Sequence, residues 1–296
     1  MRHERETARP GLATTWEGKD PALLDRVLPL VDAIETTPDA LARRRGDGAP
    51  SLAPEPLAAI VAAAGVVDVL VHGVGLSIGS ASGWSEDYLG LLDELVATVP
   101  VRWHSEHLAY TRVDGEEVGT MLALPKTDEA LELVCRRVER LRRRYDLPFL
   151  LENVVHVLPD YPGDYTEAAF LNELCRRSGC GLILDVYNLE CDRHNHGFDV
   201  DAFLADLDLG RVREIHVACG VEHRGFLLDV HSRTLRESTL KLAREAVEGA
   251  GGAVEIVTYE LLEEAVPVLG HETIAGELER LADALAGARL PAVSAA

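Results

Sequence analysis

The sequence predicts a single α/β domain, residues 1–296, folded as a (β/α)8 TIM barrel. Eight short apolar runs follow one another along the chain, and most are followed by a stretch in which apolar residues have helical spacing. No Pro/Gly/Ser-rich linker divides the 296 residues. Most runs stop at or near a side chain that can bind a metal or act as an acid or a base. These run ends are Trp16, Glu35, His72, His107, Glu152, Asp185, His216 and Glu260.

The first half of the chain supplies four of the predicted strands. Gly11–Trp16 is the first, and the helix Pro21–Leu30 follows it, because Asp20 is a good N-cap residue and proline favours the first helical position. A third strand, Val67–His72, precedes glycines that let the backbone turn tightly. The other elements of this half are the strands Val31–Glu35 and Val101–His104 and the helices Glu55–Ala64 and Ser85–Val99.

A long loop and a strongly patterned helix separate the two halves. The loop from His107 to Pro125 is long enough for a hairpin over the barrel mouth, and loops of this length are usually functional or mobile. The helix Thr127–Tyr145 begins with acidic residues and ends in a basic run, as the helix dipole favours. The second half contributes the strands Pro148–Glu152, Leu182–Asp185, Val212–His216 and Val254–Glu260, and helices around Glu167–Ser178, Val200–Leu207, Thr234–Gly249 and Glu272–Leu285.

Charge and cysteine content exclude several classes of protein. Lys plus Arg total 29 against 50 Asp plus Glu, and the net charge of −21 disfavours nucleic acid and anionic membranes as partners. The acidity is interpreted as solvated helix faces, or as an attraction for cations or a basic peptide. Five cysteines without a CxxC pair indicate neither a disulfide scaffold nor a thiolate zinc site. Without a signal peptide or membrane span, a cytoplasmic protein is expected, and residues 1–9 and 290–296 are expected to be loose tails.

The polar run ends are expected to converge in one pocket, because all strand C-termini of a parallel barrel open onto one face. A single histidine there is more often a hydrogen-bonded core residue, but several buried charges need a compensating cation. The segment Asp229-Val230-His231 adds two side chains that an extended backbone places on one face. Asn188 is either a further ligand or a turn former. These donors suit iron, manganese or zinc and are too many for one ion, so two or three metals are expected.

Several other polar residues have two interpretations each. His194 and His196 lie either in a substrate-facing loop or in an Asn-His-Gly turn, and the turn is favoured. Glu35 and Glu106 are candidates for orienting the metal-binding imidazoles. Cys219 either touches the substrate or fills space. The sequence has no GxSxG, P-loop or dinucleotide motif, so nucleophilic hydrolysis and nucleotide chemistry lack their usual support.

The order of several short segments resembles that of one known family. The segments HGVGLSIGS, SEHLAY, LPKTDEAL, LLENV, LILDVYN, NHGFD, VREIHVACG and DVHS occur in this order within the region from Val71 to Glu260. Together they resemble the multinuclear non-haem iron oxidases, formerly annotated only as a domain of unknown function. The resemblance implies a TIM barrel with two or three mixed-valent iron (Fe) ions that uses dioxygen (O2) to modify a cysteine, aspartate or asparagine of a ribosomally made precursor peptide. It also implies a small partner protein that holds the leader of that peptide.

The resemblance carries nine metal ligands over to this chain: His72, His107, Glu152, Asp185, Asn188, His216, Asp229, His231 and Glu260. We expect His107, Glu152, Asp185 and His196 to serve catalysis, and His196 lies in the matching NHGFD segment. The chain departs from the family pattern at Glu106, where the family has Asp, at Val217-Ala218-Cys219-Gly220 in place of Leu-Ala-Gly-His, and at Val230 in place of Thr. These departures leave the ligand set nearly whole and change its surroundings.

An alternative function is that of a divalent-metal sugar isomerase or epimerase, because such barrels also gather His, Asp and Glu at strand ends. That chemistry needs fewer ligands and a lysine or second acid for proton transfer, and the strand ends here offer no lysine. The negative charge disfavours a metal-dependent phosphodiesterase. A metal-stabilised peptide-binding module would not require so many donors.

Overall fold

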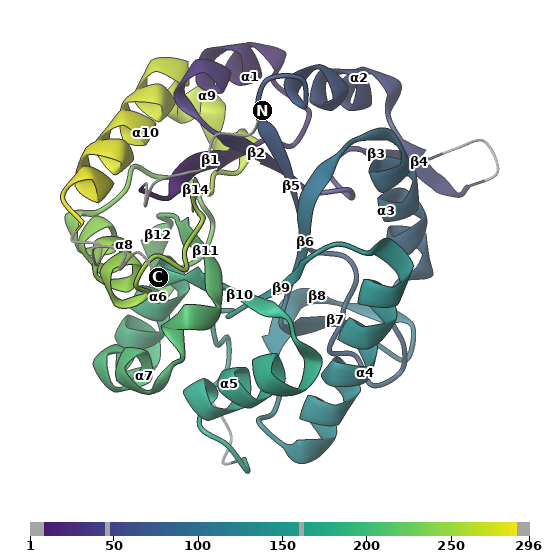
Figure 1. Cartoon of the computed structure of the whole chain (residues 1–296), viewed down its shortest axis with the longest axis vertical. Coiled ribbons are helices and arrows are strands. Elements are labelled where there is room, and N and C mark those ends of the chain that lie inside the picture. The colour runs from purple at the N-terminus through teal and green to yellow at the C-terminus, as the bar shows by residue number, and fades with distance from the viewer. Residues whose placement is uncertain (1–8, 45–47, 160–162, 289–296) are drawn as a thin grey trace, which may run out of the picture.

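The computed structural model describes residues 9–44, 48–159 and 163–288, and these form a closed barrel of eight parallel strands (Figure 1). Around the barrel the strand order is β1-β14-β11-β10-β9-β6-β5-β2. The predicted (β/α)8 fold is therefore confirmed. The barrel strands are β1 (Gly11–Thr15), β2 (Ala33–Thr36), β5 (Asp68–Gly73), β6 (Val101–His107), β9 (Phe149–Glu152), β10 (Gly181–Asp185), β11 (Val212–Val217) and β14 (Ile256–Tyr259).

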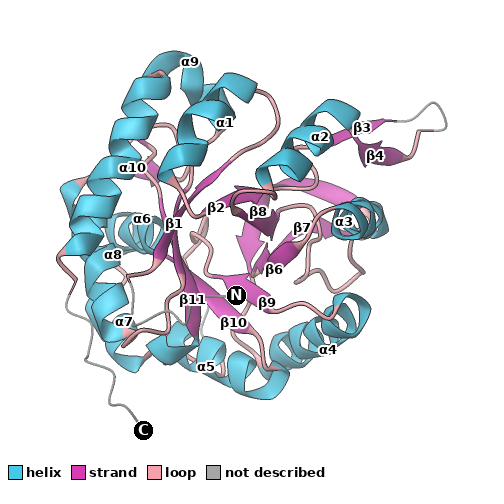
Figure 2. Ribbon diagram, turned by 45° about the horizontal axis from the view of Figure 1, so that its top comes forward, coloured by secondary structure: helices cyan, strands magenta, loops and turns pink. Residues whose placement is uncertain are grey.

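Helices surround the barrel on the outside (Figure 2). Asp20 caps the first of them as predicted, because its side chain accepts a hydrogen bond from the Leu23 N–H at 2.9 Å. The α-helix stops at Val27 and continues as a 3-10 turn through Leu30, where Pro29 cannot donate the next backbone hydrogen bond. Within the described residues, no helix is long and apolar enough to cross a membrane. The helices are α1 (Pro21–Val27), α2 (Pro54–Ala63), α3 (Glu86–Thr98), α4 (Asp128–Tyr145), α5 (Glu167–Ser178), α6 (Val186–His196), α7 (Val200–Asp206), α8 (Glu237–Gly249), α9 (Val266–Leu269) and α10 (His271–Ala286).

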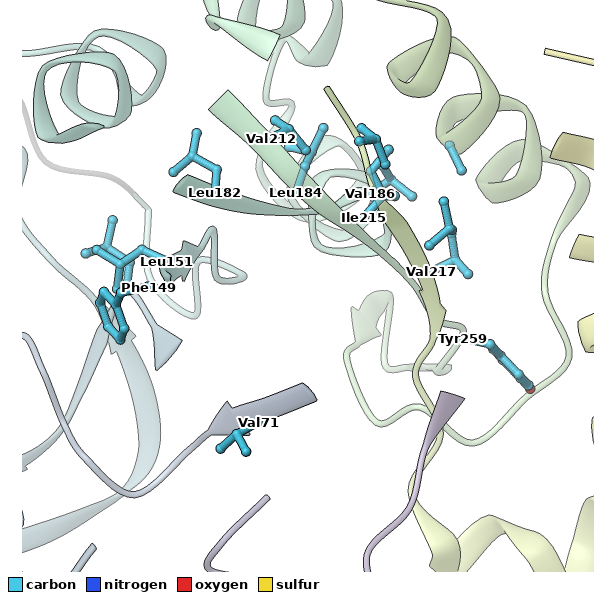
Figure 3. Close-up of a cluster of buried hydrophobic side chains, with 14 of the residues drawn as sticks. Val71, Phe149, Leu151, Leu182, Leu184, Val186, Val212, Ile215, Val217 and Tyr259 are labelled. Atoms are coloured by element: carbon cyan, nitrogen blue, oxygen red, sulfur yellow. The ribbon is translucent and has the colours of Figure 1, made fainter. Parts of the chain in front are cut away.

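Side chains alternate between the two faces of each barrel strand. Outward-facing residues such as Leu151, Leu184 and Val217 belong to the main hydrophobic core beneath the helices (Figure 3). Inward-facing residues toward the amino ends of the strands form a second apolar cluster, here called the barrel floor: Ala13, Ala33, Leu70, Trp103, Leu150, Ile183 and Ile256. Two residues further along most strands, the buried inward positions become polar. The barrel therefore has an apolar floor below a polar chamber at the carboxyl ends of the strands.

Hairpins extend from the barrel at three places. The predicted hairpin between His107 and Pro125 is present as β7 (Ala109–Val113) and β8 (Glu116–Ala123). Two further hairpins were not predicted, because strands of three residues are too short to have a readable periodicity. They are β3 (Ala42–Arg44) with β4 (Pro50–Leu52), and β12 (Val221–His223) with β13 (Phe226–Leu228).

The predicted Asn-His-Gly turn is wrong, because these residues form the end of α6. The helix runs to His196 and is terminated by Gly197, whose φ of 71° lies in the left-handed region that glycine favours. The apolar periodicity of a helix is lost there, since the buried residues of α6 include Asn188 and Asp192. The predicted loose tails lie outside the described residues except for Arg9, which is exposed.

Candidate metal centre

Six of the nine residues expected to be ligands lie at the carboxyl ends of barrel strands, and all six are buried. They are His72 on β5, His107 on β6, Glu152 on β9, Asp185 on β10, His216 on β11 and Glu260 directly after β14. Their donor atoms form overlapping groups within 4.8 Å: His72, His107 and Glu152; His72, His216 and Glu260; and Glu152, Asp185, His216 and Glu260. Because the groups share members, the barrel builds one continuous polar centre.

His72 and His107 both turn their Nε2 atoms toward Glu152. The distances to Glu152 Oε2 are 2.8 Å from His72 and 3.6 Å from His107. On the other side of the His72 ring, Nδ1 lies 3.0 Å from Ser105 Oγ, and the Ser105 hydroxyl itself donates to the Val71 carbonyl oxygen. On the other side of the His107 ring, Nδ1 lies 2.9 Å from the Gly73 carbonyl oxygen. Both partners act as acceptors, so each Nδ1 carries a proton and each Nε2 keeps a lone pair for a metal.

His216 occupies the middle of the centre and has carboxylates on both sides. Its Nδ1 lies 3.2 Å from Glu260 Oε2 and 3.7 Å from Glu152 Oε1. Its Nε2 lies 3.4 Å from Glu35 Oε2 and 3.5 Å from Glu214 Oε1. Glu35 is thus in contact with an imidazole of the centre, the position expected of an orienting residue. Its neighbour Glu214 was not singled out from the sequence.

Asp185 and Asn188 are held together at the start of α6. Asp185 Oδ1 accepts a hydrogen bond from the Asn188 N–H at 2.7 Å and thereby caps the helix. Asn188 Nδ2 donates to the Asn153 carbonyl at 3.1 Å, and the Asn153 side chain pairs with the backbone of Asp185. These bonds leave Asp185 Oδ2 and Asn188 Oδ1 buried without a hydrogen bond. Asn188 lies within the helix, so its interpretation as a turn former is wrong.

Asp229 and His231 follow β13 and meet the same centre from above the strand ends. His231 Nε2 lies 2.5 Å from Asp229 Oδ1, and His231 Nδ1 lies 3.4 Å from Glu260 Oε1. The two side chains are close together as expected, but the backbone is not extended, because His231 has a left-handed φ of 37°. Such strained residues persist where the surrounding structure requires them, often at functional sites.

The protonation equilibria of the centre reflect a shortage of positive charge. Burial raises the pKa of Glu152 to about 7 and, together with nearby Asp229, raises the pKa of Asp185 well above its usual value. Burial would lower the pKa of His216, but Glu35, Glu152 and Glu260 outweigh it and raise that pKa well above its usual value. Among the described residues, the ion pairs of the carboxylates named here come from histidines. A bound cation would supply the missing charge.

The comparison with protein families shows which family the chain belongs to. The family model for the RiPP precursor modification enzymes MbnB/TglH/ChrH matches residues 27–285. The chain belongs to this family. RiPPs are ribosomally synthesised peptides that are modified after translation, so this MbnB/TglH/ChrH protein belongs to a family of enzymes that act on precursor peptides. The resemblance drawn from the order of the sequence segments is confirmed.

Relatives and solved structures are consistent with this membership. A UPF0276 protein from Anaeromyxobacter sp. (strain Fw109-5) is 36% identical over 216 residues, which cover 73% of this chain and 75% of the relative. One from Caulobacter vibrioides (strain NA1000 / CB15N) is 35% identical over 233 residues, or 79% and 80% of the two chains. A D-psicose 3-epimerase from Clostridium cellulolyticum H10 has a TM-score of 0.57 at 13% identity, with 95% of this chain and 100% of that chain covered. The IOLI protein with a zinc atom has a TM-score of 0.60 at 13% identity, with 94% and 99% covered. These two structures share the fold alone.

Some candidate residues of the chain lie beside the centre. His196 Nε2 donates to the His156 carbonyl at 2.7 Å, so it contacts the loop after β9 and not a member of the groups above. Glu106 Oε1 lies 3.1 Å from His104 Nε2 on the outer side of β6. Cys219 packs in a small apolar cluster, as expected of a space-filling residue. The exposed His194 bonds to the Gly225 carbonyl at 3.1 Å.

Proposed function

We propose that this MbnB/TglH/ChrH family enzyme is a multinuclear non-haem iron oxidase that uses dioxygen to modify a cysteine, aspartate or asparagine side chain of its precursor peptide. The observation that carries the proposal is a set of buried oxygens that lack ordinary donors. Asp185 Oδ2 and Asn188 Oδ1 have no hydrogen bond, and Glu152 Oε2, Asp229 Oδ1 and Glu260 Oε2 have only imidazole nitrogens beside them. So many buried carboxylates are costly without cations. Oxygen and imidazole donors fit iron, and the family membership favours a peptide substrate.

The donors divide into three sets, each sufficient to hold one ion. His72, His107 and Glu152 would hold the first ion. Asp185 and His216, with Asn188 beside Asp185, would hold the second, and Asp229, His231 and Glu260 the third. Glu152 and Glu260 each contact histidines of more than one set, so each would serve two of the sets. Nine ligands are more than one ion of coordination number six can use.

The chain's own residues would position the reactants around this centre. Bound iron would supply the one-electron chemistry that dioxygen requires. His107, Glu152 and Asp185 would serve catalysis by fixing the metals, and their buried position excludes water from the reacting side chain. His196 would act indirectly, because its hydrogen bond holds the His156 loop that borders the substrate entrance. A cysteine substrate would bind a metal as its thiolate, and a carboxylate or amide through oxygen.

The surface around the centre favours a peptide over a small sugar. Eight of the eleven exposed large hydrophobic residues among the described part of the chain lie on segments that follow the carboxyl ends of barrel strands: Val74, Val113, Val118, Val157, Leu158, Phe226, Leu228 and Leu262. These residues, here called the rim, share the end of the barrel at which the strands stop, which favours an interaction site there. A cavity of ≈ 220 Å³, lined by Tyr110, Leu122 and Leu158 among others, lies between the β7–β8 hairpin and the loop after β9. An extended peptide would fit along this rim while its modified side chain enters the chamber.

The test combines metal analysis with oxygen uptake. Protein reconstituted with Fe(II) without oxygen is expected to hold two or three irons per chain by elemental analysis, with a mixed-valent Mössbauer spectrum after partial oxidation. Oxygen consumption is expected only with a precursor peptide, with a mass change on one side chain of that peptide. A small leader-binding partner protein, where the neighbouring genes encode one, is expected to lower the peptide concentration that half-saturates the enzyme.

The competing sugar epimerase makes the opposite predictions. One zinc or manganese ion per chain, turnover of a free ketose without oxygen uptake, and no effect of the peptide would refute the oxidase. The observation against the epimerase is the inner surface of the strand ends. Among the described residues there, the buried polar side chains are His, Asp, Glu, Asn, Ser and Thr, and none is a lysine.

A further inference from the structure

One charged side chain lies at the level of the barrel floor, below the centre described above. Glu214 on β11 pairs in register with Ile183 on β10 and Ile256 on β14, both of which belong to the floor. Its exposed fraction is 0%. A buried carboxylate in an apolar layer destabilises a fold unless it is fully hydrogen-bonded, so its presence calls for a functional reason.

Two neighbouring donors fix the orientation of Glu214. The Trp103 indole Nε1–H donates to Glu214 Oε2 at 2.9 Å, and the Thr258 hydroxyl donates to Oε1 at 2.5 Å. The two donors bind different oxygens of the carboxylate, so together they hold the side chain in one rotamer. One side of Oε1 still faces His216 Nε2 at 3.5 Å.

We propose that Glu214 is a positioning residue that holds the proton of His216 on Nε2 and so directs the Nδ1 lone pair at a metal. The inference rests on the proposed metal centre and adds to it how one ligand is presented. His216 Nδ1 faces Glu260 and Glu152, which belong to the ligand set, while Nε2 faces Glu214 and Glu35, which do not. A neutral imidazole has one lone pair, so a proton kept on Nε2 leaves Nδ1 as the ligand atom.

This arrangement is the reverse of that at the other two strand-end histidines. His72 and His107 have their Nδ1 atoms bonded to Ser105 Oγ and the Gly73 carbonyl, so they present Nε2. Backbone and hydroxyl acceptors suffice there because they lie beside the strands. His216 lies with its Nε2 toward the barrel interior, where the nearest acceptors are the two glutamates. The carboxylate at floor level is therefore the acceptor that this orientation requires.

Glu214 fits the role better than Glu35. Both Glu35 oxygens are buried without a hydrogen bond, so no neighbouring donor fixes the rotamer of that side chain. Glu214 is held by two donors and cannot turn away when His216 moves. The competing interpretation is that Glu35, Glu214 and His216 themselves hold a cation, since their donor atoms also lie within 4.8 Å of one another. In that case Nε2, and not Nδ1, would be the ligand atom.

The test uses full-length protein loaded with Zn(II), with no iron, oxygen or peptide, so that its outcome does not depend on the proposed oxidase activity. In histidine labelled with ¹⁵N, two-bond proton–nitrogen spectra report which ring nitrogen carries the proton and which binds metal. We expect His216, assigned by its loss in His216→Asn, to be protonated on Nε2. In Glu214→Gln the amide N–H faces Nε2 and removes the acceptor, and we expect metal affinity to fall by about 10- to 100-fold in chelator competition, as for other residues that orient ligands.

Two variants separate positioning from a structural role. Glu277→Gln replaces another buried glutamate, outside the barrel on α10, and is expected to leave metal affinity unchanged. Thr258→Val removes one of the donors that fix Glu214, and a smaller loss of affinity in the same direction is expected. The metal-free Glu214→Gln protein is expected to be as stable to urea as the wild type or more stable, because a buried negative charge is gone.

Three results would overturn the proposal. These are a wild-type His216 protonated on Nδ1, zinc anomalous scattering on the Nε2 side of that ring, and a Glu214→Gln protein with wild-type metal affinity. A Glu214→Gln protein that is less stable without metal but keeps the Nε2 proton would show a structural role, which also contradicts the proposal. If instead these tests succeed while iron loading gives no oxygen uptake with the peptide, the proposed oxidase fails and the positioning role of Glu214 stands.

Discussion

Stability between pH 6.5 and pH 9 is expected to depend on His156, in the loop after β9. Its Nδ1 lies 2.6 Å from Asp192 Oδ2, and its backbone N–H donates to Asp192 Oδ1 at 2.8 Å. Its Nε2 lies 3.6 Å from Glu167 Oε2, which Lys126 also contacts at 2.8 Å. His156 therefore lies between two largely buried carboxylates that favour its protonated form.

The size and sign of the effect follow from the pKa. Burial alone would lower the pKa of His156, but its contacts with Asp192 and Glu167 outweigh burial and raise the pKa from 6.5 to about 9. A raised pKa means that the folded state binds the proton more tightly than the unfolded state does. The stabilisation is complete below pH 6.5 and is lost as the pH rises through about 9. At roughly 1.4 kcal/mol per pKa unit, it amounts to about 3 kcal/mol.

The measurement is the free energy of unfolding in urea of metal-free wild-type protein and of His156→Gln between pH 6 and pH 10. Other groups titrate alike in both proteins, so their difference isolates His156. We expect the wild type to lose about 3 kcal/mol of its stability relative to the variant across this range. His194→Gln is the control, because His194 is exposed and contacts only a backbone carbonyl. A difference that stays constant across the range would show that folding does not shift the pKa of His156.

Three further predictions concern the centre and its entrance. Asp229→Ala and His231→Ala are each expected to lose metal by elemental analysis with unchanged circular dichroism, since both lie above the barrel floor. Gly73→Ala is expected to destabilise the protein by about 1–3 kcal/mol in urea, because the new Cβ would lie 1.8 Å from Glu106 Oε1. Leu158→Asp is expected to raise the peptide KM several-fold without changing metal content, because this side chain is 57% exposed on the rim. Val66→Asp is the control. Val66 is 75% exposed at the opposite end of the barrel, and its substitution is expected to change neither quantity.

The fold could be predicted because its main signals are local. A buried strand that ends in a polar residue and is followed by a helical stretch can be recognised without knowing its neighbours, and α5 at Glu167–Ser178 begins and ends where predicted. The β12–β13 hairpin has strands of three residues and no periodicity to detect. Helix α6 was missed because Asn188 and Asp192 turn their polar side chains inward, where the usual pattern requires apolar residues.

The candidate centre could be predicted only in part from the sequence. Strand-end position was enough to single out His72, Glu152 and Asp185, and the structure brings their side chains close together. Strand-end position was not enough to predict contacts that depend on side-chain direction. Glu106 lies on the same strand as His107 but faces the outside of the barrel. Asn153, which fixes Asp185 through two hydrogen bonds, has no feature in the sequence that distinguishes it from a loop residue.

The alternation along the strands explains why the protein can carry so many buried donors. Leu70 and His72 lie two residues apart on β5 and face the same interior, one in the floor and one in the chamber. Apolar burial in the floor and beneath the helices provides stability, while the chamber at the strand ends contributes donors instead. Loss of a chamber residue should therefore affect metal binding more than folding. Glu214 is the exception, because it places a charge at floor level, and the hydrogen bonds from Trp103 and Thr258 are what make that charge tolerable.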